Sequence, residues 1–133
     1  MAVGLKEMVA EARDRVPEIT PQDVLQRLEG GVDLLVLDVR EPQEFAQGHL
    51  PGAVNIPRGL LELKADADSP VADPAVAEKR DAQVVTYCVK APGARSLFAA
   101  DTLREMGFTN VAAMSAGVNG WTEAGLPIET ISA

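Results

Sequence analysis

The stretch Val84-Val85-Thr86-Tyr87-Cys88-Val89-Lys90-Ala91-Pro92-Gly93-Ala94-Arg95-Ser96 decides the fold of this 133-residue chain. Its β-branched, apolar start predicts a strand over residues 83–87 that ends at the only cysteine. A loop of small residues follows, and residues 95–106 then show the pattern of an amphipathic helix with Gly107 after its end. The sequence therefore places a thiol between the carboxyl end of a strand and the start of a helix.

This position favours chemistry at Cys88. Ligands of α/β proteins bind at the carboxyl ends of the strands. Loop amides and the positive end of a helix dipole favour an anion there, and with Lys90 and Arg95 they favour thiolate over thiol. Cys88 is thus a candidate nucleophile. On position alone a second interpretation stays open, in which Cys88 is a small buried hydrophobic residue.

The rest of the chain predicts an α/β fold, with a parallel sheet flanked by helices on both faces. Further strands are expected over residues 34–39, 53–57 and 110–114, with helices or helical turns at 20–29, 41–45, 58–64, 74–80 and 116–124. No linker divides the chain after residue 19, so residues 20–133 are expected to form one domain.

Residues 1–19 are predicted to form a helical extension. Apolar residues recur with a helical period between Leu5 and Val16, and Pro17 ends the helix. This helix could pack on the domain, or on a second subunit to give a homodimer.

Composition excludes several classes of function. A net charge of −8 without a basic stripe argues against a nucleic-acid partner. One cysteine excludes an internal disulfide and a multi-thiolate metal site, and with a single histidine we expect neither zinc nor another cofactor. No apolar run is long enough to span a membrane and the first residues do not resemble a signal peptide, so we expect a cytoplasmic protein.

Three motifs in register resemble the rhodanese family and cover about residues 20–127. The first is Asp38-Val39-Arg40-Glu41, with Glu44-Phe45 and the run Gly48-His49-Leu50-Pro51-Gly52-Ala53-Val54-Asn55-Ile56-Pro57. The second is Tyr87-Cys88 followed by Gly93-x-Arg95-Ser96, and the third is Ala116-Gly117-x-x-Gly120-Trp121. The resemblance implies a rhodanese-like fold.

The resemblance also implies a sulfurtransferase. Cys88 would take the outer sulfur of a donor such as thiosulfate as a persulfide and pass it to a thiol, a cyanide-type acceptor or a protein. The persulfide and the donor's anionic head need hydrogen-bond donors. Candidates are the loop amides, with the Arg95 guanidinium as anchor: Val89, Lys90, Ala91, Gly93, Ala94 and Arg95. Asp38 and Arg40 are expected to support the site structurally by pairing with each other or holding the next turn.

The chain departs from the family pattern at the cysteine loop. The family places an arginine five positions after the cysteine, whereas Arg95 is seven after Cys88, as if Ala91-Pro92 had been inserted. Glu44 stands where some members have an arginine that binds the donor. The longer loop favours persulfide carriage over efficient thiosulfate turnover, and a carboxylate at residue 44 would not attract an anionic donor.

Two other functions stay open. One is a phosphatase-like enzyme that handles phosphate or arsenate, although its pattern needs one residue fewer between Cys88 and Arg95. The other is a non-catalytic rhodanese-like module that binds or regulates a partner. His49 is expected to serve a hydrogen-bonded turn, and Trp121 to anchor the last helix in the core.

Overall fold

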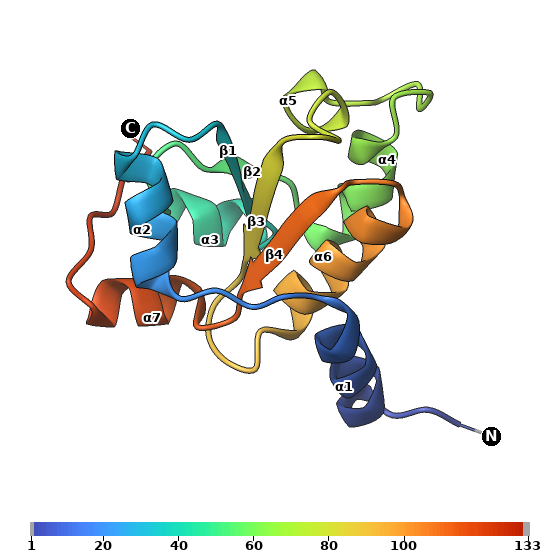
Figure 1. Ribbon diagram of the computed structural model, residues 1–133, viewed down its shortest axis with the longest axis horizontal. Helices are drawn as coiled ribbons and strands as arrows, with labels where there is room; N and C mark the ends of the chain where they lie inside the picture. Colours follow the sequence, from blue (N-terminus) through green and yellow to red (C-terminus); the bar gives the residue numbers. More distant parts are fainter. Residues whose placement is uncertain (1, 132–133) are drawn as a thin grey trace.

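In the computed structural model, which describes residues 2–131, four parallel strands form one sheet in the order β2-β1-β3-β4 (Figure 1). The strands are β1 (Leu34–Asp38), β2 (Val54–Asn55), β3 (Gln83–Tyr87) and β4 (Asn110–Met114). Apolar runs at β1 and β3 suit strands that are covered on both faces. The α/β fold predicted from the sequence is confirmed, and β2 is shorter than the five residues expected.

The register brings the carboxyl ends of the strands to one level. Asp38 pairs with Asn55 on one side and with Tyr87 on the other, and Tyr87 in turn pairs with Met114. The residues that follow these strand ends therefore share one edge of the sheet, which includes Cys88.

Helices cover both faces of the sheet (Figure 1). One face carries α1 (Leu5–Arg15), α4 (Leu61–Ala65), α5 (Pro74–Ala77) and α6 (Ala94–Glu105), and the other carries α2 (Pro21–Glu29) and α7 (Gly117–Glu123). The short helix α3 (Pro42–Gln47) follows β1, and a 3₁₀ turn, η1 (Arg58–Leu60), follows β2. Within residues 2–131, none of the helices combines the length and the apolar character needed to cross a bilayer.

Side chains alternate along the strands and so build two cores. Leu35 and Leu37 of β1 join the cluster that contains Leu97 of α6, whereas Val36 joins the cluster around Trp121 of α7. Trp121 is fully buried and its indole N–H donates to the Pro127 carbonyl at 2.8 Å. Trp121 thus anchors the last helix, as predicted.

Candidate active site at the carboxyl edge of the sheet

Cys88 lies directly after β3 and begins the segment 88–93, called here the cysteine loop. The residue is 4% exposed and belongs to the core cluster on the α6 side of the sheet. Its Sγ lies 3.6 Å from the Ser96 hydroxyl in the first turn of α6. Cys88 therefore has both the burial that the second interpretation predicted and the strand-end position that the first required.

Ser96 links the thiol to the loop. Its hydroxyl donates to the Gly93 carbonyl at 2.9 Å, and its own carbonyl accepts from the Thr86 hydroxyl at 2.8 Å. A hydroxyl has one hydrogen to donate, so a neutral thiol can only donate to Ser96, whereas a thiolate can accept if that hydrogen turns toward sulfur. Our sequence reasoning gave Ser96 no role. Its place three residues after Gly93, in a first helical turn, was the available signal.

The first two carbonyls of the cysteine loop face α7. The Cys88 carbonyl accepts from the Val118 amide at 3.0 Å, and the Val89 carbonyl accepts from the Asn119 amide at 2.9 Å. A trans peptide holds C=O and N–H on opposite sides, so the N–H groups of Val89 and Lys90 point away from α7. This close approach needs Gly117, because a Cβ there would collide with the Val89 carbonyl.

Most of the predicted amide donors are unused within the described residues. We find no protein acceptor there for the N–H groups of Val89, Lys90, Ala91, Ala94 and Arg95. Gly93 is a correction to the prediction, because its amide donates to the Lys90 carbonyl at 2.9 Å and closes a turn. Gly93 instead serves the backbone, with a φ of +74° at the N-cap of α6.

The Arg95 side chain is already paired with a carboxylate. Its guanidinium donates to both carboxylate oxygens of Glu44, at 2.9 and 3.2 Å. These hydrogen bonds hold the pKa of Glu44 below its ordinary value and raise the pKa of Arg95. The expected anchoring charge is therefore compensated locally. Lys90, in contrast, is exposed and has no ion-pair partner among residues 2–131.

Asp38 and Arg40 form a buried support beside the site. The Arg40 guanidinium donates to Asp38 at 2.7 to 3.1 Å and to the Gly48 carbonyl at 2.7 Å. Asp38 also accepts from the Tyr87 hydroxyl at 2.6 Å, and that hydroxyl accepts from the Leu50 amide at 3.1 Å. Burial and the nearby Asp38 charge raise the pKa of Tyr87, which stays protonated and keeps donating. These contacts fix the ends of β1 and β3.

His49 takes the turn role predicted for it. Its Nδ1 lies 2.9 Å from the Phe45 carbonyl, and its ring stacks on Phe45 with 3.8 Å between ring centroids. The histidine is 7% exposed, and its backbone pairs with Glu129. These contacts account for the side chain without a catalytic role.

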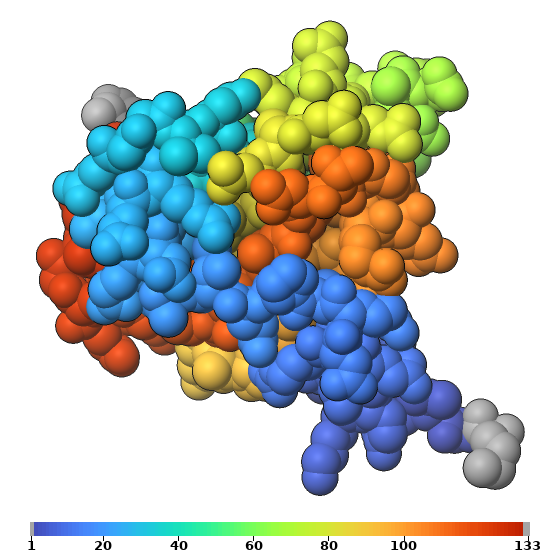
Figure 2. Space-filling view, viewed as in Figure 1, coloured from blue at the N-terminus to red at the C-terminus, as the bar shows by residue number. Residues whose placement is uncertain are grey.

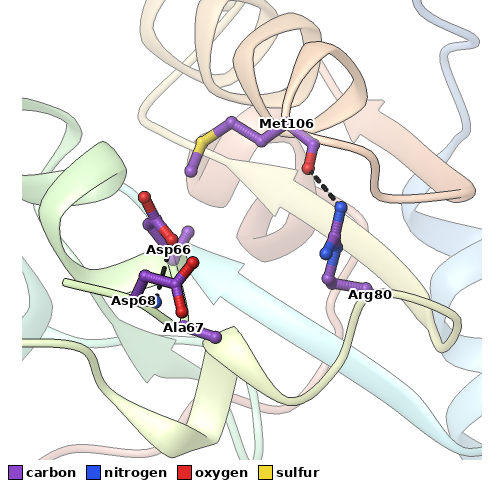
Figure 3. A pocket seen from close by; sticks show the side chains of 6 residues that line it. Asp66, Ala67, Asp68, Arg80 and Met106 are labelled. Carbon is purple, nitrogen blue, oxygen red and sulfur yellow. Dashed lines mark hydrogen bonds between the residues drawn. The ribbon is translucent and has the colours of Figure 1, made fainter.

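A separate pocket of about 330 Å³ lies between the residues after α4, the residues before β3 and the end of α6 (Figure 3). Asp66, Asp68, Arg80 and Met106 line it, and the Arg80 guanidinium donates to the Met106 carbonyl at 2.9 Å (Figure 3). Arg80 precedes β3 and Met106 follows α6, so this pocket is remote from Cys88. Residues 2–131 contain no group of three or more His, Cys, Asp or Glu side chains placed to hold a metal ion.

Comparisons with known proteins place the chain in a family context. A family model described as "Rhodanese-like domain" matches residues 20–124. A protein named "Sulfurtransferase" from Allochromatium vinosum is 35% identical over 85% of this chain and 94% of its own length.

Two solved structures are similar over nearly the whole chain. A protein of unknown function from Rhodopseudomonas palustris, described as a possible tyrosine phosphatase, has a TM-score of 0.88 and 36% identity, covering 97% of this chain and 96% of the other. A polysulfide-sulfur transferase homodimer from Wolinella succinogenes has a TM-score of 0.71 and 30% identity, covering 96% and 88%.

Proposed function

The chain belongs to the rhodanese-like domain family, and from this premise we propose that it is a sulfurtransferase with Cys88 as the sulfur carrier. The observation that carries the proposal is the placement of the thiol. Cys88 directly follows the central strand β3, and the amides of five residues that come after it, in the loop and at the start of α6, have no acceptor within residues 2–131. Relatives named as sulfurtransferases support the same reaction class.

The proposed reaction has two displacements at sulfur. The Cys88 thiolate attacks the outer sulfur of the donor, the bond between that sulfur and the rest of the donor breaks, and the donor leaves with the electron pair. Cys88 then carries a persulfide anion. An acceptor thiolate attacks the outer sulfur, and Cys88 leaves as thiolate. The sulfur atom moves without an external oxidant or reductant, so the mechanism requires no cofactor.

Each step develops negative charge at the same place. The N–H groups of Val89, Lys90, Ala91, Ala94 and Arg95 have no acceptor within residues 2–131, and with the positive end of α6 they would stabilise the persulfide and the leaving group. The Ser96 hydroxyl would supply one more hydrogen bond once it turns toward sulfur. The chain therefore builds its anion site locally, within a molecule of net charge −8.

Burial and charge pairing together favour one class of donor. Cys88 is 4% exposed, which suits a small or slender sulfur chain. Glu44 compensates the charge of Arg95, so a dianion such as thiosulfate gains little from that arginine. We therefore propose a persulfide or polysulfide donor in preference to thiosulfate, in a reducing compartment such as the cytoplasm, where the cysteine stays reduced.

Sulfur loading of Cys88 tests the function. The reduced protein is incubated with polysulfide or with thiosulfate, and its intact mass is measured. We expect a gain of one sulfur atom that is absent in Cys88→Ser and that is removed by an acceptor thiol. No gain with either donor in a folded protein would contradict the proposal.

The R. palustris structure favours one alternative, a phosphatase. In the phosphatase pattern the arginine after the cysteine would bind the phosphate ester, but Arg95 is paired with Glu44 at 2.9 Å. Hydrolysis of an aryl phosphate that disappears in Cys88→Ser, without sulfur loading, would replace the sulfurtransferase by this alternative. Neither activity, together with stable capture of a protein partner, would favour a binding or regulatory module.

The W. succinogenes structure also suggests an assembly, since it is described as a homodimer and matches 96% of this chain. Helix α1 exposes Leu5 and Met8, at 64% and 48%. We propose that these side chains contact α1 of a second copy. Sedimentation should give a dimer for the whole chain and a monomer for the double variant Leu5→Glu/Met8→Glu. A monomeric whole chain would contradict the assembly and leave the sulfur-transfer proposal intact.

A further inference from the structure

Helix α1 lies against the cysteine loop although it is outside the matched family region (Figure 2). Val9 and Ala12 on its buried face and Val16 at its C-cap pack into the core cluster on the α6 side. Arg15 at its end donates to both carboxylate oxygens of Asp101 on α6, at 2.9 and 2.8 Å. The helix is thus held on the domain by contacts that do not involve the loop.

Arg13 makes a separate contact to the loop itself. Its Nη2 donates to the Pro92 carbonyl at 3.2 Å, across 79 residues of sequence. Its Nε donates to Glu18 at 3.2 Å, and the Glu18 backbone is bridged to Ala113 in β4. Arg13 therefore connects the exposed tip of the loop to the edge of the sheet.

The loop has little other support at this point. Ala91 and Pro92 are exposed, and a hollow of about 410 Å³ lies between Pro92 and part of α1. Its lining is largely apolar and comes from both sides: Leu5, Lys6, Val9, Ala10, Arg13, Pro92 and Ala94. Because a hollow supplies few packing contacts, the hydrogen bond from Arg13 carries much of the restraint on Pro92.

The contact acts on the peptide that closes the loop. The Pro92 carbonyl shares a planar peptide unit with the Gly93 N–H, and that N–H donates to the Lys90 carbonyl at 2.9 Å. Fixing the carbonyl from outside therefore fixes the turn 90–93 and the direction of the Ala91 amide within it.

We propose that Arg13 is a positioning residue, through which the N-terminal helix holds the cysteine loop in its sulfur-binding shape. The role in transfer rests on the proposed function, whereas the effect on the loop does not. Helix α1 is then part of the site, and the hydrogen bond from Arg13 restrains a loop that is two residues longer than the family pattern.

The test compares two arginines of the same helix. Arg13→Gln removes the bond to Pro92, and Arg15→Gln is the matched control, since the two side chains are 43% and 46% exposed and each has one carboxylate partner outside α1. Arg13→Lys keeps a cation that can still donate to the carbonyl. All variants are made in the full chain, and their thermal midpoints are recorded.

Amide hydrogen exchange of the segment 88–97 is the readout that does not depend on activity. We expect Arg13→Gln to speed exchange of the Gly93 amide by about 3- to 10-fold, as for the loss of one hydrogen bond. Arg15→Gln should leave this amide within twofold even if it lowers the thermal midpoint more. Equal exchange in Arg13→Gln and the parent, or equal acceleration in both glutamine variants, would overturn the positioning role.

The kinetic readout is sulfur loading by polysulfide. Arg13→Gln should raise the half-saturating donor concentration by a similar factor, with Arg13→Lys restoring most of it and Arg15→Gln unchanged. If the Gly93 amide exchanges faster in Arg13→Gln but the parent chain loads no sulfur, the role of Arg13 in the loop would stand and the sulfurtransferase proposal would be rejected. Faster exchange without any change in loading would restrict Arg13 to loop structure and overturn its part in transfer.

Discussion

Two arginine–carboxylate pairs lie at the same edge of the sheet and differ in their surroundings. The side chains of Arg40 and Asp38 are 6% and 0% exposed, whereas those of Arg95 and Glu44 are 39% and 33% exposed. The buried pair has further partners in Tyr87 and the Gly48 carbonyl. The second pair lies next to the cysteine loop, in which the amides of Val89, Lys90 and Ala91 have no acceptor within residues 2–131.

The difference teaches that one chemistry serves two purposes. A buried ion pair cannot lose a partner cheaply, because the remaining charge has no water to solvate it. A half-exposed pair is screened by solvent and contributes little to stability, so its charges can be changed to suit a ligand. The Asp38–Arg40 pair therefore stabilises the strand ends, whereas the Glu44–Arg95 pair can influence which sulfur donor binds.

The largest effect is expected from breaking the buried pair. Asp38→Asn should lower the free energy of unfolding by about 3–5 kcal/mol, because the Arg40 charge stays buried without its counter-ion. The change is measured by urea unfolding. The double variant Asp38→Leu/Arg40→Met, which removes both charges, should lose less than the single variant. A larger loss in the double variant would contradict the explanation by an unpaired charge.

A smaller effect, on sulfur loading more than on stability, is expected from breaking the half-exposed pair of Arg95 and Glu44. Glu44→Gln should change the free energy of unfolding by less than about 1 kcal/mol and raise sulfur loading from thiosulfate by about 3- to 10-fold, because Arg95 becomes available to the dianion. Loading is followed by intact mass over time.

Glu41→Gln is the matched control for Glu44→Gln. It removes the same charge three residues away, from the N-cap of α3, without freeing Arg95. An equal gain in both variants would assign the effect to net charge and not to the pair.

The smallest effect is expected from a change of pH, which should leave the influence of Glu44 on thiosulfate loading nearly constant. Hydrogen bonds from Arg95 lower the pKa of Glu44, so the carboxylate is ionised throughout the neutral range. Its contribution to the pair is present above the pKa of the unfolded chain and is lost only as the pH falls through the lower pKa of the folded state. The ratio of thiosulfate loading between Glu44→Gln and the parent should therefore stay within twofold from about pH 6 to pH 8. A steady decline of that ratio toward pH 6 would show that the carboxylate is already being protonated.

Local patterns in the sequence predicted most of the elements and the position of the thiol. Strand periodicity, the Thr20-Pro21 helix start and the glycine at residue 93 act over a few residues, so they can be read without the fold. The pairing of Asp38 with Arg40 could also be expected from the sequence, because the two residues are two positions apart at a strand end.

Folding alone decided which groups at the site are still available for a ligand. Arg95 meets Glu44 across 51 residues and Arg13 meets Pro92 across 79, and no local pattern encodes such contacts. The same holds for the burial of Cys88, which depends on how α6 packs against the sheet. The sequence by itself therefore determined the strands, the helix starts and the residue types at the site. Tertiary structure determined their pairing and exposure, since both depend on neighbours that are distant along the chain.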